Sequence, residues 1–286
     1  MNNTSKGLII TSSGVLLMSL ESLFIKLTTI SPYVFSFYLG IFIFLAMALT
    51  IIVKEKNTVK EIRKTSLSIL LLCGLLMGIA NIFFISAVKS TTVANVVIIF
   101  GTSALFTSIL AYLIYREKIK KNIMYASFFV FIGLYIIFSD ELGLGNLKGN
   151  IYAVLCVFSF SIVYVLLSKH TKISRVVLTA LTGLSLSLLA FFLAEDINID
   201  LHNLGIIAVM GLFITPYSRV LIGNGTKFIH SSEVSLLLII ETLMAPIWVW
   251  IFLHEVPSNN TFFGGSIILL TLVINSLYSL NKGKIR

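Results

Sequence analysis

The sequence predicts an all-α integral membrane protein with ten transmembrane helices, arranged as two inverted five-helix repeats with both termini in the cytoplasm. Hydrophobic residues make up 57% of the 286 residues and charged residues only 12%, at a mean hydropathy of +1.02. This composition leaves too little polar surface for a soluble globule. In addition, ten apolar stretches follow one another along the chain, and the basic residues between them fall almost entirely in alternate gaps.

Each apolar stretch has about the length that one membrane crossing requires. A helix needs about 20 mostly apolar residues to cross the hydrocarbon layer, because each residue adds about 1.5 Å. The spans predicted in the first half are residues 7–27, 32–53, 67–88, 91–115 and 122–139. Those predicted in the second half are residues 149–168, 176–194, 204–223, 232–253 and 262–280.

The distribution of Lys and Arg predicts the topology. The amino-terminal segment and every second gap hold Lys6, Lys54, Lys56, Lys60, Arg63, Lys64, Arg116, Lys118, Lys120, Lys121, Lys169, Lys172, Arg175, Lys227, Lys282, Lys284 and Arg286. The other gaps hold Lys89 and Lys148, whereas Lys26 and Arg219 fall inside predicted spans. By the positive-inside rule, both termini are cytoplasmic and the number of spans is even. We expect a multi-pass protein of the bacterial plasma (inner) membrane.

A weak internal repeat divides the chain into two halves. When the second half is aligned on the first with a shift of 138 positions, Tyr112 pairs with Trp250 and Glu117 with Glu255. We therefore expect a first repeat over residues 1–148 and a second over residues 149–286. Since each repeat contains an odd number of spans, the two copies have opposite orientations across the membrane. Inverted repeats are typical of secondary transporters, although duplication also occurs in proteins that transport nothing.

Several short motifs resemble the EamA-like branch of the drug/metabolite transporter superfamily. They are SLFIK at 22–26 followed by Ser31-Pro32, YREK at 115–118, Gly133, IETLMAPIWVW at 240–250, His254-Glu255 and Gly264-Gly265. The chain departs from the family pattern at Leu39, Ala104 and Thr242. The resemblance covers essentially the whole chain. It implies a ten-helix transporter of small organic solutes (a metabolite, amino acid or drug-like compound), often an exporter, with no dedicated cofactor.

Two acidic residues inside predicted spans need an explanation, because a charge at the bilayer centre costs on the order of 2.5 to 3.5 kcal/mol. Glu241 lies close to the expected midplane, and Glu21 lies somewhat beyond it. A buried carboxyl can titrate near neutral pH, so Glu241 is a candidate for proton coupling or for binding a substrate amine. The alternative is a structural acid bonded to a neighbouring helix, with Pro246 freeing a backbone carbonyl one turn later.

Two basic residues inside spans raise the same question. Lys26 shares a helix face with Ser19 and Ser22, a polar stripe that either lines a cavity or packs against another helix while Lys26 snorkels to the interface. Arg219 follows Pro216, which interrupts backbone hydrogen bonding and marks a candidate helix break or gate. Arg219 therefore either binds an anionic substrate, pairs with Glu241 as a gate, or snorkels to the headgroups.

Three uncharged polar residues complete the candidate pathway. Asn81 and Asn95 lie in the third and fourth spans, where such side chains either join helices or bind solute. Trp248 lies toward the outer end of the ninth span and either shapes a pocket or belongs to the interfacial aromatic belt.

Other classes of function lack a sequence signature. The four His residues are scattered without metal-ligand spacing, and no phosphate-binding loop is recognisable. We therefore expect no enzyme, no cofactor, no metal and no nucleic-acid partner, but a secondary transporter of a small solute, proton- or gradient-coupled or exporting, that works by alternating access. The alternatives are a passive channel and a non-transporting membrane sensor or scaffold. The expected partners are the small-molecule substrate and the lipid bilayer, with the protein as a monomer or homodimer.

Overall fold

The computed structural model describes residues 3–54, 67–116, 121–141, 147–170, 173–225, 228 and 231–283, and all regular structure in these ranges is helical. In the first half the helices are α1 (Asn3–Met18), α2 (Glu21–Leu27), α3 (Pro32–Lys54), α5 (Leu67–Ser90), α6 (Val93–Gly101), α7 (Ser103–Tyr115) and α8 (Lys121–Glu141). In the second half they are α9 (Leu147–Lys169), α10 (Arg175–Leu193), α11 (Leu201–Val209), the π-helix η1 (Met210–Ile214), α12 (Thr215–Gly225), α13 (Ser231–Leu253) and α14 (Asn259–Gly283).

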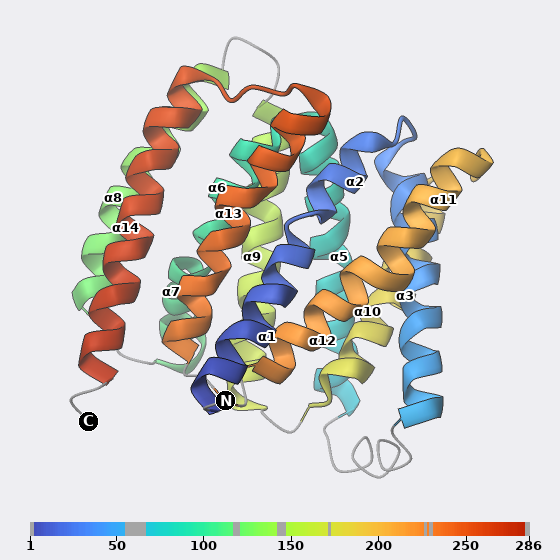
Figure 1. The fold of residues 1–286 in the computed structure, drawn as a ribbon, viewed down its shortest axis with the longest axis horizontal. Coiled ribbons are helices and arrows are strands. Elements are labelled where there is room, and N and C mark those ends of the chain that lie inside the picture. Colours follow the sequence, from blue (N-terminus) through green and yellow to red (C-terminus); the bar gives the residue numbers. More distant parts are fainter. Residues whose placement is uncertain are drawn as a thin grey trace.

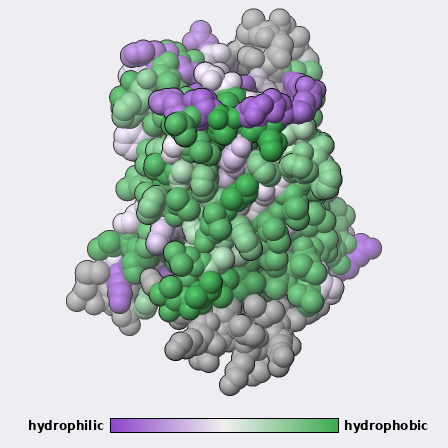
Figure 2. All heavy atoms as spheres, turned by 90° about the vertical axis from the view of Figure 1, so that its right-hand side faces the viewer, coloured by the Kyte–Doolittle hydropathy of each residue, from purple (hydrophilic) through white to green (hydrophobic). Residues whose placement is uncertain are grey.

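The protein is a multi-pass, all-helical integral membrane protein. Within the described ranges, six helical stretches are long and apolar enough to cross a membrane: Ser5–Leu27, Pro32–Val53, Leu67–Ser90, Leu147–Lys169, Arg175–Leu193 and Leu201–Ile222. The pair α6 and α7, whose axes differ by 42°, forms a seventh when it is counted as one span. On the face drawn in Figure 2, hydrophobic side chains form a broad band, and hydrophilic ones gather above it.

Two predicted spans are interrupted in the structure. The first breaks at Ser19 and Leu20, between α1 and α2, and the fourth breaks at Thr102, between α6 and α7. At both breaks a hydroxyl bonds to its own backbone: Ser19 Oγ donates to the Leu16 carbonyl at 2.7 Å, and Thr102 Oγ1 donates to the Ile99 carbonyl at 2.6 Å. Such local bonds compete with the regular helical pattern and bend helices.

The first turn of α11 is capped by Asp200, the residue that precedes it. The Asn203 N–H donates to Asp200 Oδ2 at 3.1 Å, and Asn203 Nδ2 donates to Asp200 Oδ1. This arrangement satisfies an N–H that the first turn of a helix leaves free. Together, the two bonds hold the pKa of Asp200 below its ordinary range.

Helix pairing follows a pattern in which the two halves exchange roles. α3 of the first half packs on α10 of the second half, and α8 of the first half packs on α14 of the second half. Likewise α1 packs on α12, whereas α9 packs on α5. If α9 is the counterpart of α1 and α12 is the counterpart of α5, the contact of α1 with α12 is equivalent to the contact of α9 with α5. In Figure 1, α1 begins and α14 ends at the same lower end of the molecule.

The backbone conformation at two helix ends agrees with the shift of 138 positions between the two halves. The residues that end α7 and α13 are Arg116 and His254, which lie 138 positions apart. Both adopt the left-handed conformation, with φ of 57° and 55°, and these are the two non-glycine residues with positive φ in the described part of the chain. Residues other than glycine rarely adopt this conformation, so its occurrence at matching positions indicates a common origin of the two helix ends.

Glycines allow the paired helices to approach closely. A Cβ atom on Gly183 of α10 would lie 2.7 Å from the backbone N of Phe44, and one on Gly40 of α3 would lie 2.6 Å from the Gly183 carbonyl oxygen. On α8 and α14, Gly133 and Gly264 face each other in the same way. Small residues at such contacts are a common means of packing helices in membranes.

Candidate functional site

Three charged residues from both halves of the chain lie within electrostatic range of one another in the interior. Glu21 is the first residue of α2, Arg219 lies on α12 and Glu241 lies on α13. The two glutamates are only 8% and 7% exposed. Because burying a charge is costly unless it is compensated, this group is the centre of the candidate site.

Arg219 joins the two halves through a hydrogen bond. Its Nη2 donates to Asn81 Oδ1 of α5 at 2.9 Å, while Asn81 Nδ2 donates to the Met77 carbonyl at 2.6 Å. In the described part of the chain Arg219 forms no ion pair with Glu21 or Glu241, and its Nη1 is buried without a hydrogen-bond partner. Nη2 is therefore held by Asn81, whereas Nη1 can donate to an additional acceptor.

Asn81 and Arg219 also occupy matching positions of the repeat, since they too are 138 residues apart. Their bond therefore lies where the two halves meet on equivalent helices, α5 and the run from α11 to α12. A contact of this kind is placed to respond when one half moves against the other.

The helix that carries Arg219 is distorted beside the glutamates. The Thr215 N–H bonds to the Met210 carbonyl, a π-helical spacing, and Pro216 follows with no N–H to donate. The Thr215 hydroxyl faces the Glu21 carboxyl, yet Thr215 Oγ1 and Glu21 Oε1 are both buried without a hydrogen bond of good geometry. π-helical turns occur frequently at functional sites. By contrast, α13 continues through Pro246.

Trp248 contacts the break between α1 and α2. Its Nε1 donates to Ser19 Oγ at 2.9 Å, so a residue of the ninth predicted span holds the broken segment of the first. Trp250 is 56% exposed and faces outward. The two tryptophans of α13 therefore have different surroundings, one against the first span and one at the surface.

Asn95 lies at a junction of helices rather than beside the charged group. It accepts a bond from Thr261 Oγ1 of α14 at 2.5 Å, and its Nδ2 donates to Asn150 Oδ1 of α9 at 3.4 Å and to Thr91 Oγ1 at 3.3 Å. These bonds connect α6 to α9 and to α14, as the helix-joining alternative expects.

Lys26 forms an ion pair at the far end of α2. Its Nζ lies 2.8 Å from Glu255 Oε2 and donates to the Thr91 carbonyl at 2.9 Å. Glu255 Oε1 in turn accepts from the N–H of Val93, the first residue of α6, at 2.6 Å. Sequence reasoning noted Glu255 as a repeat residue but missed it as the partner of Lys26; a lone lysine inside a span was the available signal.

A row of aromatic rings was also missed. The rings of Phe84, Phe100, Phe160 and Tyr164 contact one another in succession, the first two contacts edge-to-face and the third stacked, with centroid separations of 5.9, 5.2 and 6.0 Å. Tyr164 lies within electrostatic range of Arg219 and Glu241 and is 43% exposed. The row therefore connects α5 and α6 to α9. Aromatic residues are so frequent in membrane helices that no sequence pattern distinguished these four.

The site residues reported so far bear no resemblance to a metal centre. Among the residues that the structure describes, no three His, Cys, Asp or Glu side chains gather in a way that would hold a metal ion. Cys73 and Cys156 are buried free thiols.

Broken helices beside buried charges in a multi-pass helical protein are typical of membrane transporters. Within that class, the chain belongs to the EamA-like transporter family, whose model matches residues 5–139 and again residues 147–277. The two matches cover nearly the whole sequence. Proteins of this family are typically transporters rather than enzymes, and this protein is a membrane transporter of that family.

Similar proteins support this assignment. An uncharacterized transporter of Clostridium kluyveri is 27% identical over 263 residues, which cover 86% of this chain and 82% of that protein. An uncharacterized transporter of Archaeoglobus fulgidus is 22% identical over 213 residues, 71% of this chain and 68% of that protein. A solved structure described as "Crystal structure of protein" aligns with a TM-score of 0.66 and 16% identity over 96% of this chain and 98% of that chain, a likeness that shows the fold alone.

Proposed function

We propose that the protein is a secondary transporter that moves a small organic solute by alternating access between two inverted five-helix halves, coupled to protons or another ion gradient. The observation that carries this proposal is the bond between Arg219 and Asn81. It joins equivalent positions of the two halves, beside carboxyls contributed by both. A site at the interface of inverted repeats is the arrangement on which alternating access depends.

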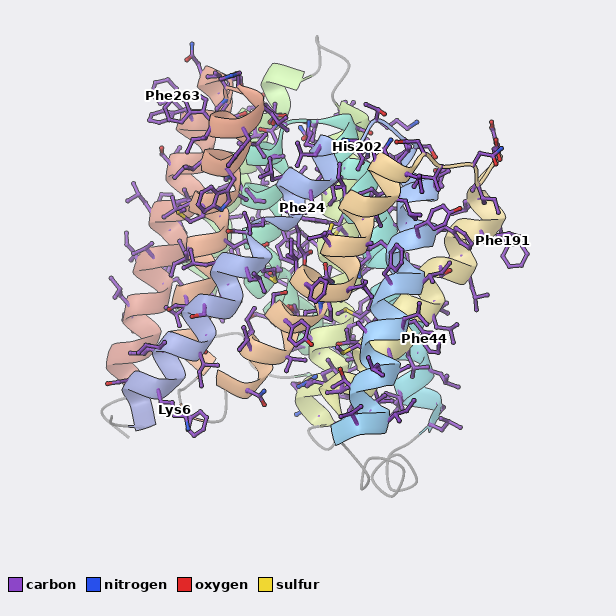
Figure 3. The ribbon with its side chains drawn as sticks, turned by 45° about the vertical axis from the view of Figure 1, so that its right-hand side comes forward. Lys6, Phe24, Phe44, Phe191, His202 and Phe263 are labelled. Atoms are coloured by element: carbon purple, nitrogen blue, oxygen red, sulfur yellow. The ribbon has the colours of Figure 1, made fainter. Side chains whose placement is uncertain are left out.

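The proposed topology has ten crossings with both termini in the cytoplasm. Besides the six long apolar stretches and the bent pair, three shorter apolar helices, Ile123–Ile137, Leu237–Leu253 and Asn259–Asn275, supply the remaining crossings. Lys6 lies near the start of α1 (Figure 3), at the end of the molecule where α14 also ends (Figure 1), which agrees with both termini on one side of the membrane. We place the repeats at residues 1–148 and 149–286, in a bacterial plasma membrane.

Within this scheme the charged group binds the solute and the coupling proton. Glu241 is the proposed proton carrier, since it is buried within electrostatic range of Glu21 and Arg219. Arg219 offers its free Nη1 to an acceptor on the solute, Glu21 offers Oε1 to a donor, and Asn81 fixes the guanidinium. Trp248, Pro216 and Pro246 are proposed to shape the pathway, whereas Asn95 is left to helix packing.

Solute uptake into proteoliposomes tests the proposal. A thermal-shift screen of the purified protein against amino acids, amines and weak-acid metabolites identifies the ligand, because a ligand stabilises the state that it binds. We expect saturable uptake of that solute, accelerated by an imposed pH gradient and absent from liposomes without protein. If no compound in the three classes is transported, the proposal is wrong. A conductance without saturation would instead indicate a channel.

A further inference from the structure

The end of α2 is held by groups from three other segments. The ion pair of Lys26 with Glu255 joins α2 to the residues that follow α13. The bond from Val93 N–H to Glu255 extends this junction to the start of α6. Lys89 of α5 adds two bonds to Thr28, one to its carbonyl at 2.6 Å and one to its hydroxyl at 2.8 Å.

This junction is closed and partly shielded from solvent. The side chains of Lys26 and Glu255 are each 22% exposed, and Lys26 lies within electrostatic range of Lys89. The Glu255 carboxylate therefore compensates one of two neighbouring ammonium groups and also accepts at a helix N-terminus, where negative charge is favoured. Removal of either partner leaves a partly buried charge without compensation, which is much more costly than the loss of an exposed ion pair.

The short helix α2 connects this junction to the charged group. Glu21 is its first residue and Lys26 lies in its last turn, so a rigid element of seven residues, about 10 Å long, carries both. Its other end meets the break at Ser19 and Leu20, where the Ser19 N–H still bonds to the Val15 carbonyl at 2.9 Å but the Leu20 N–H bonds to the Leu17 carbonyl at 3.3 Å, a 3₁₀-type spacing that interrupts the regular pattern. Figure 3 shows Phe24 of α2 near the middle of the molecule, whereas Phe191 and Phe263 lie at its periphery.

From these observations we infer that α2 is the gate at this mouth of the pathway and that the Lys26–Glu255 pair is the latch that closes it. The mouth is the end opposite the start of α1, at the top of Figure 1. The break at Ser19 allows α2 to swing without the rest of the first span, and Glu21 moves with it. Solute or proton binding at Glu21 thereby reaches the latch through one helix. The inference rests on the proposed function, since a mouth presupposes a pathway.

Cysteine labelling tests the latch without a known solute. Ser22 of α2 is 2% exposed and becomes the reporter as Ser22→Cys. A membrane-impermeant maleimide is applied to right-side-out and to inside-out vesicles, and labelling of the parent protein, whose Cys73 and Cys156 are buried, is subtracted. We expect slow labelling of Ser22→Cys, and a rate about tenfold higher after Lys26→Gln or Glu255→Gln, from one side only.

Three controls make the result specific. The double variant Lys26→Gln/Glu255→Gln should label no faster than either single variant, because the two residues act as one pair. Lys148→Gln, which removes a lysine at the same end, should leave the rate unchanged. Thr182 of α10 is fully buried away from the latch, and Thr182→Cys should remain unlabelled in every variant.

The inference is overturned if both single variants label at the parental rate, if their effects add, or if Thr182→Cys becomes reactive together with Ser22→Cys. The last result would mean that the pair holds the fold together rather than closing a mouth. Since labelling requires no transport, a failure of the uptake experiment and a failure of the latch are separate results.

Discussion

The variant Glu241→Gln is expected to abolish proton coupling while folded protein remains in the membrane. Glutamine has nearly the same shape as glutamic acid but cannot release a proton, so the substitution removes the proposed carrier near Glu21 and Arg219 without creating a cavity. For one proton exchanged per solute, each unit of pH gradient supports about tenfold accumulation. In Glu241→Gln this accumulation should vanish, and labelled solute should only equilibrate across the membrane of proteoliposomes.

A matched substitution shows whether the effect belongs to the site. Glu195 lies exposed in the segment before α11, and Glu195→Gln should accumulate solute as the parent does. If Glu241→Gln still accumulates solute in response to the pH gradient, Glu241 is a structural acid, as one interpretation of the sequence allowed. The carrier would then have to be sought among other groups, with Glu21 first.

The second large effect concerns the glycine contacts between helices. Gly183→Ala would place its Cβ 2.7 Å from the Phe44 backbone N and 2.8 Å from the Gly40 carbonyl oxygen. Backbone atoms cannot relieve the clash by a rotamer change as a side chain can, so α3 and α10 must move apart. Overpacking of this kind costs about 1–3 kcal/mol. We expect a lower apparent melting temperature for Gly183→Ala in detergent, and likewise for Gly264→Ala, whose Cβ would meet the Gly133 carbonyl oxygen at 2.6 Å.

Gly205 of α11 provides the control, because a Cβ there meets nothing within 4 Å. Alanine favours a helix over glycine by about 1 kcal/mol, so Gly205→Ala should melt at the parental temperature or above it. If Gly183→Ala melts together with Gly205→Ala, the close approach of α3 and α10 does not contribute to stability.

The membrane class and the family could be predicted from the sequence because both depend on features spread over the whole chain. Apolar runs of membrane-spanning length follow from hydropathy, and the family match at residues 5–139 and 147–277 confirms the resemblance that short motifs indicated. Pro216 marked the eighth span as a candidate break, and that helix is distorted just before it, but the breaks within the first and fourth spans were not predicted. Those at Ser19 and Thr102 depend on single hydroxyls that bond to their own backbone, and serine or threonine in an apolar run more often leaves a helix intact.

The candidate site was only partly accessible to sequence reasoning. The cost of burying charge singled out Glu21, Lys26, Arg219 and Glu241 without any knowledge of the fold. Their partners could not be found in that way, since Asn81 and Glu255 lie far from Arg219 and Lys26 in sequence. The register of 138 residues is the signal that pairs Asn81 with Arg219, because equivalent positions of two repeats meet near any twofold axis that relates them.

Counterflow in proteoliposomes tests the central claim most directly. Vesicles are loaded with a high concentration of the unlabelled solute identified by thermal shift and diluted into a trace of the labelled solute, with no pH gradient. Each time an alternating-access transporter releases an unlabelled solute outside, it can bind a labelled one and carry it into the vesicle. We therefore predict that the label inside the vesicles rises transiently above its outside concentration. If the label only equilibrates across the membrane, whether or not the vesicles contain unlabelled solute, alternating access is contradicted. The protein would then be a channel or a protein that does not transport.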